Sequence, residues 1–403
     1  MSKPDDTDAM TSPPPVIPAA VRRLRLSEFR CYETLELEVD ARPVALFGEN
    51  GAGKTNLLEA LSFLAPGRGL RSAGADGVAR KQDGISAPAW AVYAEIETYD
   101  GCFKLGAGAR AGGRRETRID GDPAQQAELS RLIPMIWLTP AQDRLFAGPR
   151  ADRLKFFDRL VYAADPAHAE AATAYEKTRV RRQRLLDDGR ADPAWVAALE
   201  TEMAGHGVAV AAARLEALIR LQTEIDARPE GAFPQADLAL DGAVEADLAA
   251  GISAPDAEDR FARALREGRG RDGAVGRTLT RGPHRTELMT RHRDKDQPAG
   301  DCSTGEQKAL ILTLALAQAR VLALRNSIAP LLLFDEACAH LDAARRDGLA
   351  HEILATRSQA WLTGVERVLF EPFGDRAQYL RVQDGSVFPA GMEPRTPGAS
   401  ETS

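Results

Sequence analysis

Two short stretches of the chain combine residue types that handle phosphate and magnesium. The first, GENGAGKT at residues 48–55, has glycines at 48 and 53 followed by Lys54 and Thr55, which is the spacing of a phosphate-binding loop. Glycines let backbone N–H groups turn toward phosphate oxygens, a lysine reaches the terminal phosphates, and a threonine hydroxyl ligates magnesium. A plain tight turn is the alternative, and the Lys-Thr pair disfavours it. We therefore predict a nucleotide site at Gly48, Glu49, Asn50, Gly51, Ala52, Gly53, Lys54, Thr55 and Asn56.

The second stretch, PLLLFDEACAHLD at residues 330–342, is an apolar run that ends in two adjacent carboxylates, Asp335 and Glu336. In a parallel sheet the carboxyl ends of strands face the ligand crevice. Asp335 can then hold Mg²⁺ through water, while Glu336 polarises the attacking water and Lys54 stabilises the phosphates. The alternative, that both acids only cap a following helix, stays open.

A third stretch, DCSTGEQKALILTLALAQAR at residues 301–320, joins a run of small polar residues to an apolar helical pattern. One capping side chain is enough to start a helix, so this turn has more polar groups than capping requires. A turn with Gly305 at a helix start can accept anionic oxygen. One phosphate loop is already present, so the second anion site is redundant unless it serves another molecule.

The motifs require particular elements around them. Alternation from Val21 to Asp40 and the apolar run at 43–50 predict two strands before the glycine-rich loop, and leucines at helical spacing predict a helix after it, which Pro66 ends. Residues 86–120 alternate again with Asp-Gly and Gly-Gly turn pairs, which indicates an antiparallel meander. Residues 150–229 are rich in Ala, Leu, Arg and Glu, which predicts a helical arm.

Composition excludes several classes of protein. The chain has 403 residues, 44% hydrophobic and 28% charged, with a net charge of -7, so any polyanion site must be a local basic patch. Its four cysteines contain no CxxC pair, which is typical of a reducing compartment and of buried small side chains. The N-terminus has acids and prolines in place of a secretory signal, and no apolar stretch approaches the roughly 20 residues of a membrane span. We expect a cytoplasmic protein without a membrane partner.

The three motifs together show a resemblance. GENGAGKTNLLEAL, CSTGEQKALILTLALAQA and LLLFDEACAHLD resemble the Walker A, signature and Walker B plus D-loop motifs of SMC and ABC-type ATPase heads, and most closely those of the RecF family of bacterial recombination mediators. LRLSEFRCYETLELE, LTPAQDRLFAGPRADRLKFFDRL, YEKTRVRRQRLL and RGPHRTEL resemble further segments in the family's order, from Leu24 to Gly385. The implied fold is α/β: an ABC-type P-loop head with a mixed sheet and antiparallel meander, and an inserted, mainly helical arm.

The resemblance implies a head-to-head homodimer that binds two ATP molecules with Mg²⁺ between its subunits. Ser303, Gly305 and Gln307 would then touch the γ-phosphate across the dimer, with Asp342 in the D-loop. The family pattern also places Gln142 as the Q-loop glutamine near the metal and the attacking water, and Arg30 and Thr363 at nucleotide-site positions. Leu154 and Lys155 depart from the pattern, which usually has further arginine there. Slow ATP hydrolysis is expected.

The resemblance also implies binding to duplex DNA and to junctions beside single-stranded gaps, with RecO-like and RecR-like partners, in replication and recombinational repair. Independently, basic residues gather in the meander and on the arm, where they can neutralise backbone phosphates. A solvated face or pairing with nearby acids is the alternative reading. The candidate DNA-contacting residues are Lys104, Arg110, Arg114, Arg115, Arg179 and Arg182.

The expected organisation is a tail at 1–20, a first head part at 21–160, an arm at 161–280, a second head part at 281–388 and a tail at 389–403. Two other functions are compatible with such motifs: the ATPase head of a membrane transporter, and an SMC-like DNA tether. A transporter head would lack the arm, and a tether would have hundreds of coiled-coil residues. The short arm favours neither.

Overall fold

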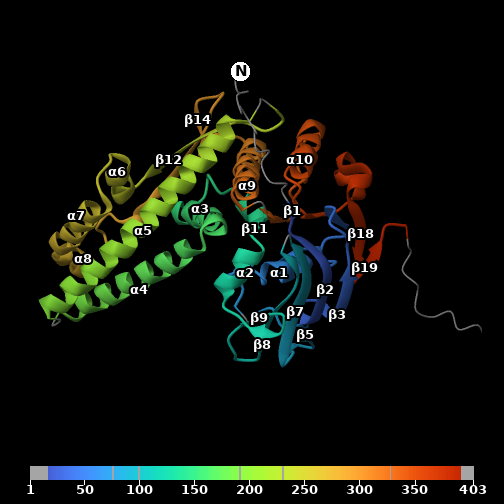
Figure 1. Cartoon of the computed structure of the whole chain (residues 1–403), viewed down its shortest axis with the longest axis horizontal. Coiled ribbons are helices and arrows are strands. Elements are labelled where there is room, and N and C mark those ends of the chain that lie inside the picture. The colour runs from blue at the N-terminus through green and yellow to red at the C-terminus, as the bar shows by residue number, and fades with distance from the viewer. Residues whose placement is uncertain are drawn as a thin grey trace, which may run out of the picture.

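The computed structural model describes residues 17–74, 77–98, 100–189, 192–228, 231–326 and 328–391. Most of the two predicted tails therefore lies outside the described residues. Figure 1 shows a broad body of sheets and helices, from which a helical arm extends to one side.

The centre of the body is a mostly parallel sheet. Among the described strands its order is β11-β16-β17-β4-β18-β19, and only the β18–β19 pair is antiparallel. The carboxyl ends of β4, β16 and β17 therefore meet at one edge, which positions the residues that follow them. The strands are β4 (Val44–Phe47), β11 (Met135–Leu138), β16 (Leu331–Phe334), β17 (Ala360–Gly364), β18 (Gln378–Gln383) and β19 (Ser386–Pro389).

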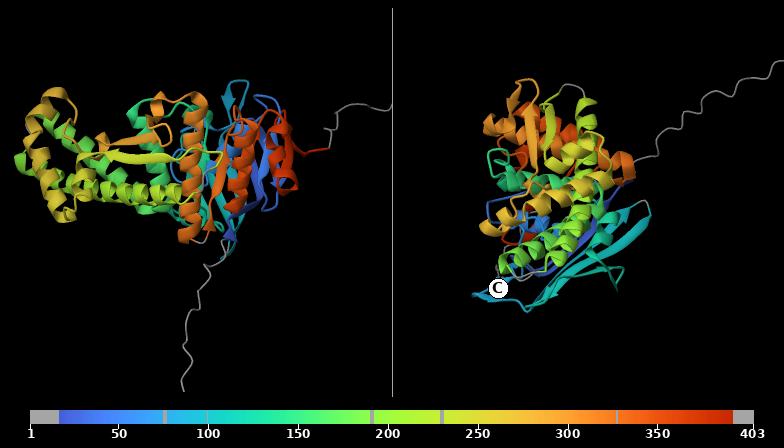
Figure 2. Two further views of the ribbon diagram at one scale, coloured as in Figure 1. Left: turned by 90° about the horizontal axis from the view of Figure 1, so that it is seen from above. Right: turned by 90° about the vertical axis from the view of Figure 1, so that its left-hand side faces the viewer.

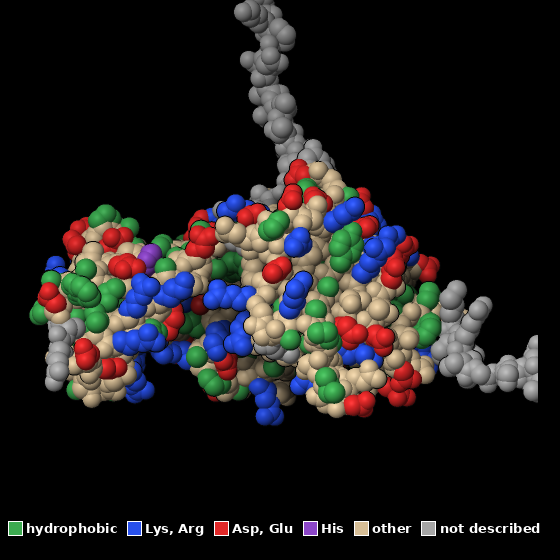
Figure 3. All heavy atoms as spheres, turned by 90° about the horizontal axis from the view of Figure 1, so that it is seen from below, with side chains coloured by type: hydrophobic (Ala, Val, Ile, Leu, Met, Phe, Trp, Pro, Cys, Tyr) green, Lys and Arg blue, Asp and Glu red, His purple; other side chains and the backbone are tan. Residues whose placement is uncertain are grey.

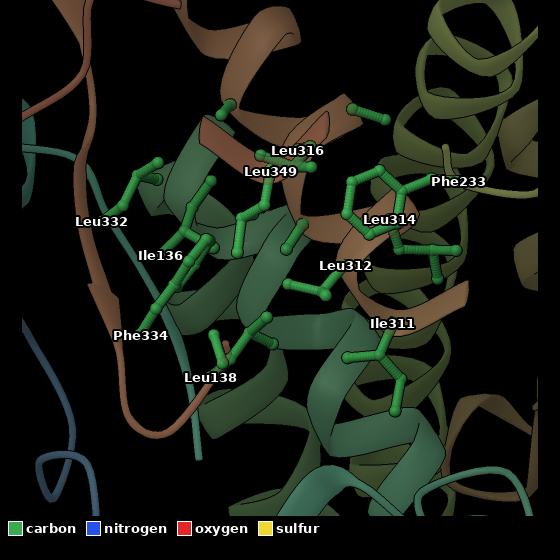
Figure 4. Close-up of a cluster of buried hydrophobic side chains, with 14 of the residues drawn as sticks. Ile136, Leu138, Phe233, Ile311, Leu312, Leu314, Leu316, Leu332, Phe334 and Leu349 are labelled. Carbon is green, nitrogen blue, oxygen red and sulfur yellow. The ribbon is translucent and has the colours of Figure 1, made fainter. Parts of the chain in front are cut away.

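This sheet is buried on both faces, and successive residues of each strand enter different cores. In β16, Leu332 and Phe334 join the core that also contains Leu312 and Leu349, as Figure 4 shows, whereas its other two leucines join the second core. The two-residue period of a strand explains this division. The first core lies under α3 (Arg150–Ala164), α9 (Thr304–Asn326) and α10 (Ala343–Ala355), and the second includes α1 (Lys54–Ser62).

An antiparallel sheet covers the second core, in the order β10-β9-β8-β7-β2-β3. The predicted meander is confirmed, and the alternating stretch from Val21 reverses at Arg30, whose φ is 56°, and forms two paired antiparallel strands. These strands are β2 (Ala20–Phe29), β3 (Tyr32–Glu38), β7 (Ala89–Thr98), β8 (Gly101–Arg110), β9 (Glu116–Ile119) and β10 (Asp122–Pro123).

The arm has its own small core, in which Tyr175, Met203, Phe261 and Leu265 pack together. Figure 2 shows its long helices running away from the head. The arm boundaries are less sharp than predicted, because α3 crosses residue 160 and β12 pairs with β13, which lies beyond residue 280. The elements here are α4 (Pro166–Asp188), α5 (Pro193–Asp226), β12 (Ala236–Asp241), α6 (Ala243–Ala249), α7 (Ala254–Glu267), α8 (Arg269–Val275), β13 (Glu287–His292) and β14 (Gln297–Pro298).

Short elements complete the described part of the chain. One of them, β1, pairs with β15 although it lies within the predicted tail. They are β1 (Ile17–Pro18), β5 (Lys81–Gln82), β6 (Ile85–Ser86), α2 (Gln126–Leu132), β15 (Ile328–Ala329) and the 3-10 helices η2 (Pro140–Gln142), η3 (Pro283–Arg285), η4 (Ala299–Asp301) and η5 (Arg367–Arg376).

Two expectations from the sequence were wrong: that no apolar stretch approaches the length of a membrane span, and that the cysteines are buried. Within the described residues, Thr304–Leu324 of α9 is long and apolar enough to pass as a membrane span. However, 89% of that window is buried inside the protein, and a core helix passes the same test. The cysteines were expected to be buried, but Cys31 and Cys102 are exposed.

Candidate functional site

The glycine-rich loop follows β4 and leads into α1, which begins at Lys54. Gly48 and Gly53 have φ values of 148° and 113°. A Cβ on Gly48 would lie 2.1 Å from the carbonyl oxygen of Val382, and one on Gly53 would lie 2.7 Å from the hydroxyl of Tyr32. Only glycine fits either position, so the spacing seen in the sequence is required by the fold.

Lys54 is the cation of this loop. Its Nζ donates to the carbonyl oxygens of Gly48 and Glu49, both at 2.7 Å. Burial lowers the pKa of Lys54, and the charges of Glu336 and Asp335 act in the opposite direction. No carboxylate forms an ion pair with it among the described residues. Lys54 is therefore held inside the loop by neutral groups and can bind phosphate oxygens.

Asp335 joins the two predicted halves of the site. Its Oδ1 accepts a hydrogen bond from the Thr55 hydroxyl at 2.8 Å and from the Thr363 hydroxyl at 2.7 Å. The three residues come from α1, the end of β16 and β17, which the parallel sheet brings together. The glycine-rich loop and the carboxylates after β16 were predicted to form one site, and the hydrogen bond between Thr55 and Asp335 shows that they lie together.

The residues at this junction fit a magnesium ion held together with phosphates. No group of three His, Cys, Asp or Glu side chains that could cage a metal occurs in the part of the chain described. Mg²⁺ is usually bound by one or two protein ligands plus substrate phosphates and water. The Thr55 hydroxyl and the Asp335 carboxylate supply the hard oxygen ligands for that arrangement.

Glu336 has an unusual backbone and a free side chain. Its φ is 53°, its N–H donates to Thr363 Oγ1 at 2.9 Å, and Lys308 Nζ donates to its carbonyl oxygen at 2.9 Å. Among the described contacts its carboxylate accepts no hydrogen bond. The backbone is thus fixed on both sides while the half-buried carboxylate stays available as a base.

A cavity of about 840 Å³ opens beside these residues, and its walls include Thr55, Gln142, Asp335 and Glu336. Gln142, on 3-10 helix η2, therefore lies in the cavity wall together with Asp335 and Glu336, and its role as the Q-loop glutamine stays a prediction. Its Oε1 accepts a hydrogen bond from the backbone N–H of Thr139 at 2.8 Å, so the side chain would have to release this bond to reach a ligand.

The turn at the start of α9 is a helix cap in the single chain. The Ser303 hydroxyl and backbone N–H both bond to Glu306, and the Glu306 N–H reaches back to Ser303, which is a capping box. Gln307 is buried and donates to the carbonyl oxygens of Gly300 and Cys302. We call Ser303–Gln307 the signature turn. None of its described hydrogen bonds reaches the glycine-rich loop.

Asp342 and Gly305 lie close together through Arg345. Asp342 caps α10 by accepting from the Arg345 N–H at 2.8 Å, and the Arg345 guanidinium lies 3.6 Å from the position of a Cβ on Gly305. Asp342 and the signature turn thus border one region of the same chain.

Three comparisons with known proteins bear on this arrangement. Residues 20–385 match the family model for the RecF/RecN/SMC N-terminal domain. The chain is 47% identical over 371 residues to the DNA replication and repair protein RecF of Rhizobium meliloti, covering 91% of this chain and 97% of that protein. It is 48% identical over 381 residues to RecF of Caulobacter sp. strain K31, again with 91% and 97% covered. The chain belongs to the RecF family.

Solved structures agree on the fold. A structure of the recombination mediator protein RecF-ATPrS in the RecFOR pathway superposes with a TM-score of 0.79 at 18% identity, covering 93% of this chain and 98% of the other. The Smc head domain of Pyrococcus furiosus gives 0.52 at 15% identity, covering 92% and 95%. The predicted ABC-type head with a helical arm is confirmed for this RecF-family chain.

Arg30, which is partly exposed, is paired with a buried acid. Its guanidinium binds both carboxylate oxygens of Glu59 at 2.8 and 2.6 Å, and Nη1 donates to the carbonyl oxygen of Gly77. Glu59 lies on α1 and is fully buried. Arg30 thus braces the helix that begins at Lys54. A nucleotide contact by Arg30 stays a prediction.

The structure separates the predicted DNA-contacting residues into two groups. Lys104, Arg110 and Arg114 are exposed and have no ion pair among the described residues. Arg179 pairs with Glu176 at 2.5 Å, and Arg115 is half-buried over the Phe63 ring, where burial lowers its pKa to about 10.

Arg182 was assigned wrongly. It is fully buried in the arm, where it binds Glu200 at 3.1 Å, Asp272 at 2.9 Å and the carbonyl oxygen of Leu265 at 2.6 Å. A guanidinium that is fully buried among these partners stabilises the arm and is not accessible to DNA.

Sequence reasoning missed Lys308. This buried lysine bonds to the carbonyl oxygen of Glu336 and lies 3.5 Å from Asp143, so it ties the helix of the signature turn to the end of β16. The sequence feature that could have pointed to Lys308 is its position directly after Gln307, inside the CSTGEQKALILTLALAQA motif.

Proposed function

We propose that this chain is an ATP-dependent DNA-binding protein of replication and recombinational repair, and that it hydrolyses ATP slowly. What carries the proposal is the junction in which Asp335 accepts hydrogen bonds from Thr55 and Thr363 beside Lys54. The family membership and the names of the similar RecF proteins support the repair role.

In the proposed reaction the loop residues Gly48–Thr55 bind the phosphates, and Mg²⁺ neutralises their charge when it is bound. Thr55 and Asp335 hold that ion, Lys54 stabilises the terminal phosphate, and Gln142 and Glu336 orient the attacking water. Glu336 accepts the proton of that water. Arg30 holds α1 in place through Glu59.

The finer parts of the proposal come from the family resemblance. ATP binding joins two copies head to head, and Ser303, Gly305, Gln307 and Asp342 of one copy complete the site of the other. The dimer binds duplex DNA and gap junctions and acts with RecO-like and RecR-like partners in the cytoplasm. The exposed cations Lys104, Arg110 and Arg114 suit the phosphates of such DNA.

Phosphate release from ATP, measured with and without gapped duplex DNA, tests this function. Asp335→Asn should reduce turnover roughly 100-fold because the carboxylate charge at the metal is lost. Asp375→Asn is the matched control, since Asp375 is an exposed carboxylate whose side chain has no described partner. Equal turnover in Asp335→Asn and the parent would contradict the proposed site.

A further inference from the structure

A second cavity adjoins the nucleotide cavity. It has a volume of about 540 Å³ and lies between the loop after α1 and the helices α3 and α4. Ser72, Lys155 and Arg159 line both cavities, so they form a shared wall. Figure 3 shows Lys and Arg side chains gathered on the hollowed face between the arm and the head.

Arg159 in this wall is a partly buried cation with no ion pair in the described part of the chain. Its guanidinium lies 4.8 Å from the Trp137 ring and 5.6 Å from the Phe156 ring. One nitrogen donates to the carbonyl oxygen of Trp137 at 3.0 Å, whereas Nε is buried without a partner. No carboxylate pairs with Arg159 among the described residues. Burial lowers its pKa to about 10, so the group stays charged at neutral pH.

Other cations continue from this wall along the arm. Arg68 in the second cavity and Arg144 in the nucleotide cavity are exposed and unpaired within the described structure. A third cavity, of about 610 Å³, shares Pro66 and Gly67 with the second. Its wall contains the exposed, unpaired Lys177 and Arg181. We call the second and third cavities together the arm groove.

The carboxylates of the arm groove cancel only part of this charge. Asp158 is bound by Arg214 and His168, and Asp152 in the nucleotide cavity lies 3.7 Å from Lys155. Glu202 accepts a hydrogen bond from Thr178, and Glu170 is exposed in the wall of the third cavity. The five Lys and Arg side chains that line the second and third cavities outnumber the three carboxylates there, and they are spread over two adjoining cavities, which suits a chain of phosphates better than one small anion.

A short backbone route joins Arg159 to the nucleotide site. Arg159 donates to the carbonyl oxygen of Trp137 on β11, and the next carbonyl on that strand, at Leu138, accepts from the N–H of Asp335 at 2.9 Å. The same strand leads into η2, which places Gln142 in the nucleotide cavity.

From this geometry we infer that the arm groove binds the sugar–phosphate backbone of a nucleic acid strand, with Arg159 binding a phosphate at the wall shared with the nucleotide cavity. A phosphate of the bound strand accepts hydrogen bonds from Arg159 and holds this side chain in place. Through the bond from Arg159 to the Trp137 carbonyl, it thereby fixes the position of β11 and, with it, Asp335 and Gln142. Arg159 is thus a positioning residue that couples nucleic acid binding to ATP turnover. The inference rests on the proposed function, to which it adds the surface that binds the nucleic acid and the residue that couples this binding to ATP turnover.

Arg159→Gln tests the inference in three measurements on the full chain: ATP affinity without DNA, affinity for fluorescent gapped DNA over a salt series, and ATP turnover with and without that DNA. We expect ATP affinity within twofold of the parent, DNA affinity lower by about tenfold with a shallower salt slope, and loss of the stimulation by DNA. Arg159→Lys keeps the charge and should recover part of the DNA affinity.

Arg357→Gln is the matched control, because this exposed, unpaired arginine precedes β17 and so lies at the opposite edge of the parallel sheet. Weaker ATP binding by Arg159→Gln without DNA would overturn the inference and make Arg159 a nucleotide ligand. Unchanged DNA affinity and stimulation would also overturn it. If Arg159→Gln does not fold, Arg68→Gln with Lys177→Gln tests the groove at exposed positions, and parental DNA affinity in that variant would overturn the inference. A parent chain that binds no DNA would instead contradict the proposed function.

Discussion

The nucleotide site and the signature turn are both rich in polar residues, but they use them differently. At the nucleotide site, side chains from separate segments meet at Asp335, while Lys54 and Glu336 form no ion pair within the described structure. In the signature turn, Ser303 and Glu306 bond to each other, and Gln307 bonds to the carbonyls just before it. The first region can bind a ligand within one chain, whereas the second is a helix cap whose described hydrogen bonds all stay within the turn and the residues before it. The proposed trans site predicts that a second chain brings the nucleotide to this turn.

The largest effect is expected at the nucleotide site. Lys54→Met removes the cation that the loop holds beside the carbonyls of Gly48 and Glu49. We expect kcat/KM for ATP to fall roughly 1000-fold, because both phosphate binding and charge stabilisation are lost. Steady-state ATP turnover measures this loss. Parental turnover would show that the loop is only a tight turn.

Glu336→Gln separates binding from hydrolysis at the same site. The backbone bonds of Glu336 to Thr363 and Lys308 do not involve the carboxylate, so the fold should be unchanged. We expect turnover to fall about 100-fold with ATP affinity retained, because only the base is lost. Equilibrium binding of a fluorescent ATP analogue, alongside turnover, tests both statements. Parental turnover would remove Glu336 from the reaction.

Two substitutions at Ser303 distinguish the cap from a contact between chains. Ser303→Ala removes the capping hydroxyl and should lower the free energy of unfolding by about 1 kcal/mol, as urea denaturation would measure. Ser303→Arg has a similar capping defect but adds a bulky cation to an exposed position, so it should block ATP-dependent dimerisation while a single chain still binds ATP. If Ser303→Arg dimerises with ATP as well as Ser303→Ala does, the turn is a helix cap and not a contact between chains.

The smallest effect concerns pH. Lys295 and then Ser303 lower the pKa of Glu306 to about 2. Because the folded pKa lies below the unfolded value, the charged Glu306 stabilises the fold at neutral pH, and this contribution is lost as pH falls from about 4.5 toward 2. The side chain is only partly buried, so solvent screening keeps the effect small. The difference in unfolding free energy between Glu306→Gln and the parent should narrow between pH 5 and 3, and a constant difference would contradict the charge role.

The sequence predicted the fold class and the way the strand, loop and helix bring Lys54, Thr55 and Asp335 together. Those features depend on local spacing and on the rule that parallel strands share one ligand edge. It did not predict the partners of Arg182, because Asp272 lies 90 positions away and meets it only when the arm helices pack. The brace between Arg30 and Glu59 and the bond from Lys308 to the Glu336 carbonyl escaped prediction for the same reason. A sequence pattern shows where a charged residue stands in the chain, but the packing of distant segments decides whether that charge is paired.

Light scattering of the full chain with and without ATP and Mg²⁺ tests most directly whether the signature turn serves a second molecule. The parent, and more strongly Glu336→Gln, should change from the mass of one chain to that of two when ATP is added, while Ser303→Arg stays at one. Gapped DNA should strengthen the dimer. A parent and a Glu336→Gln variant that bind ATP yet remain single chains would contradict the shared site and leave Ser303–Gln307 as the cap of α9.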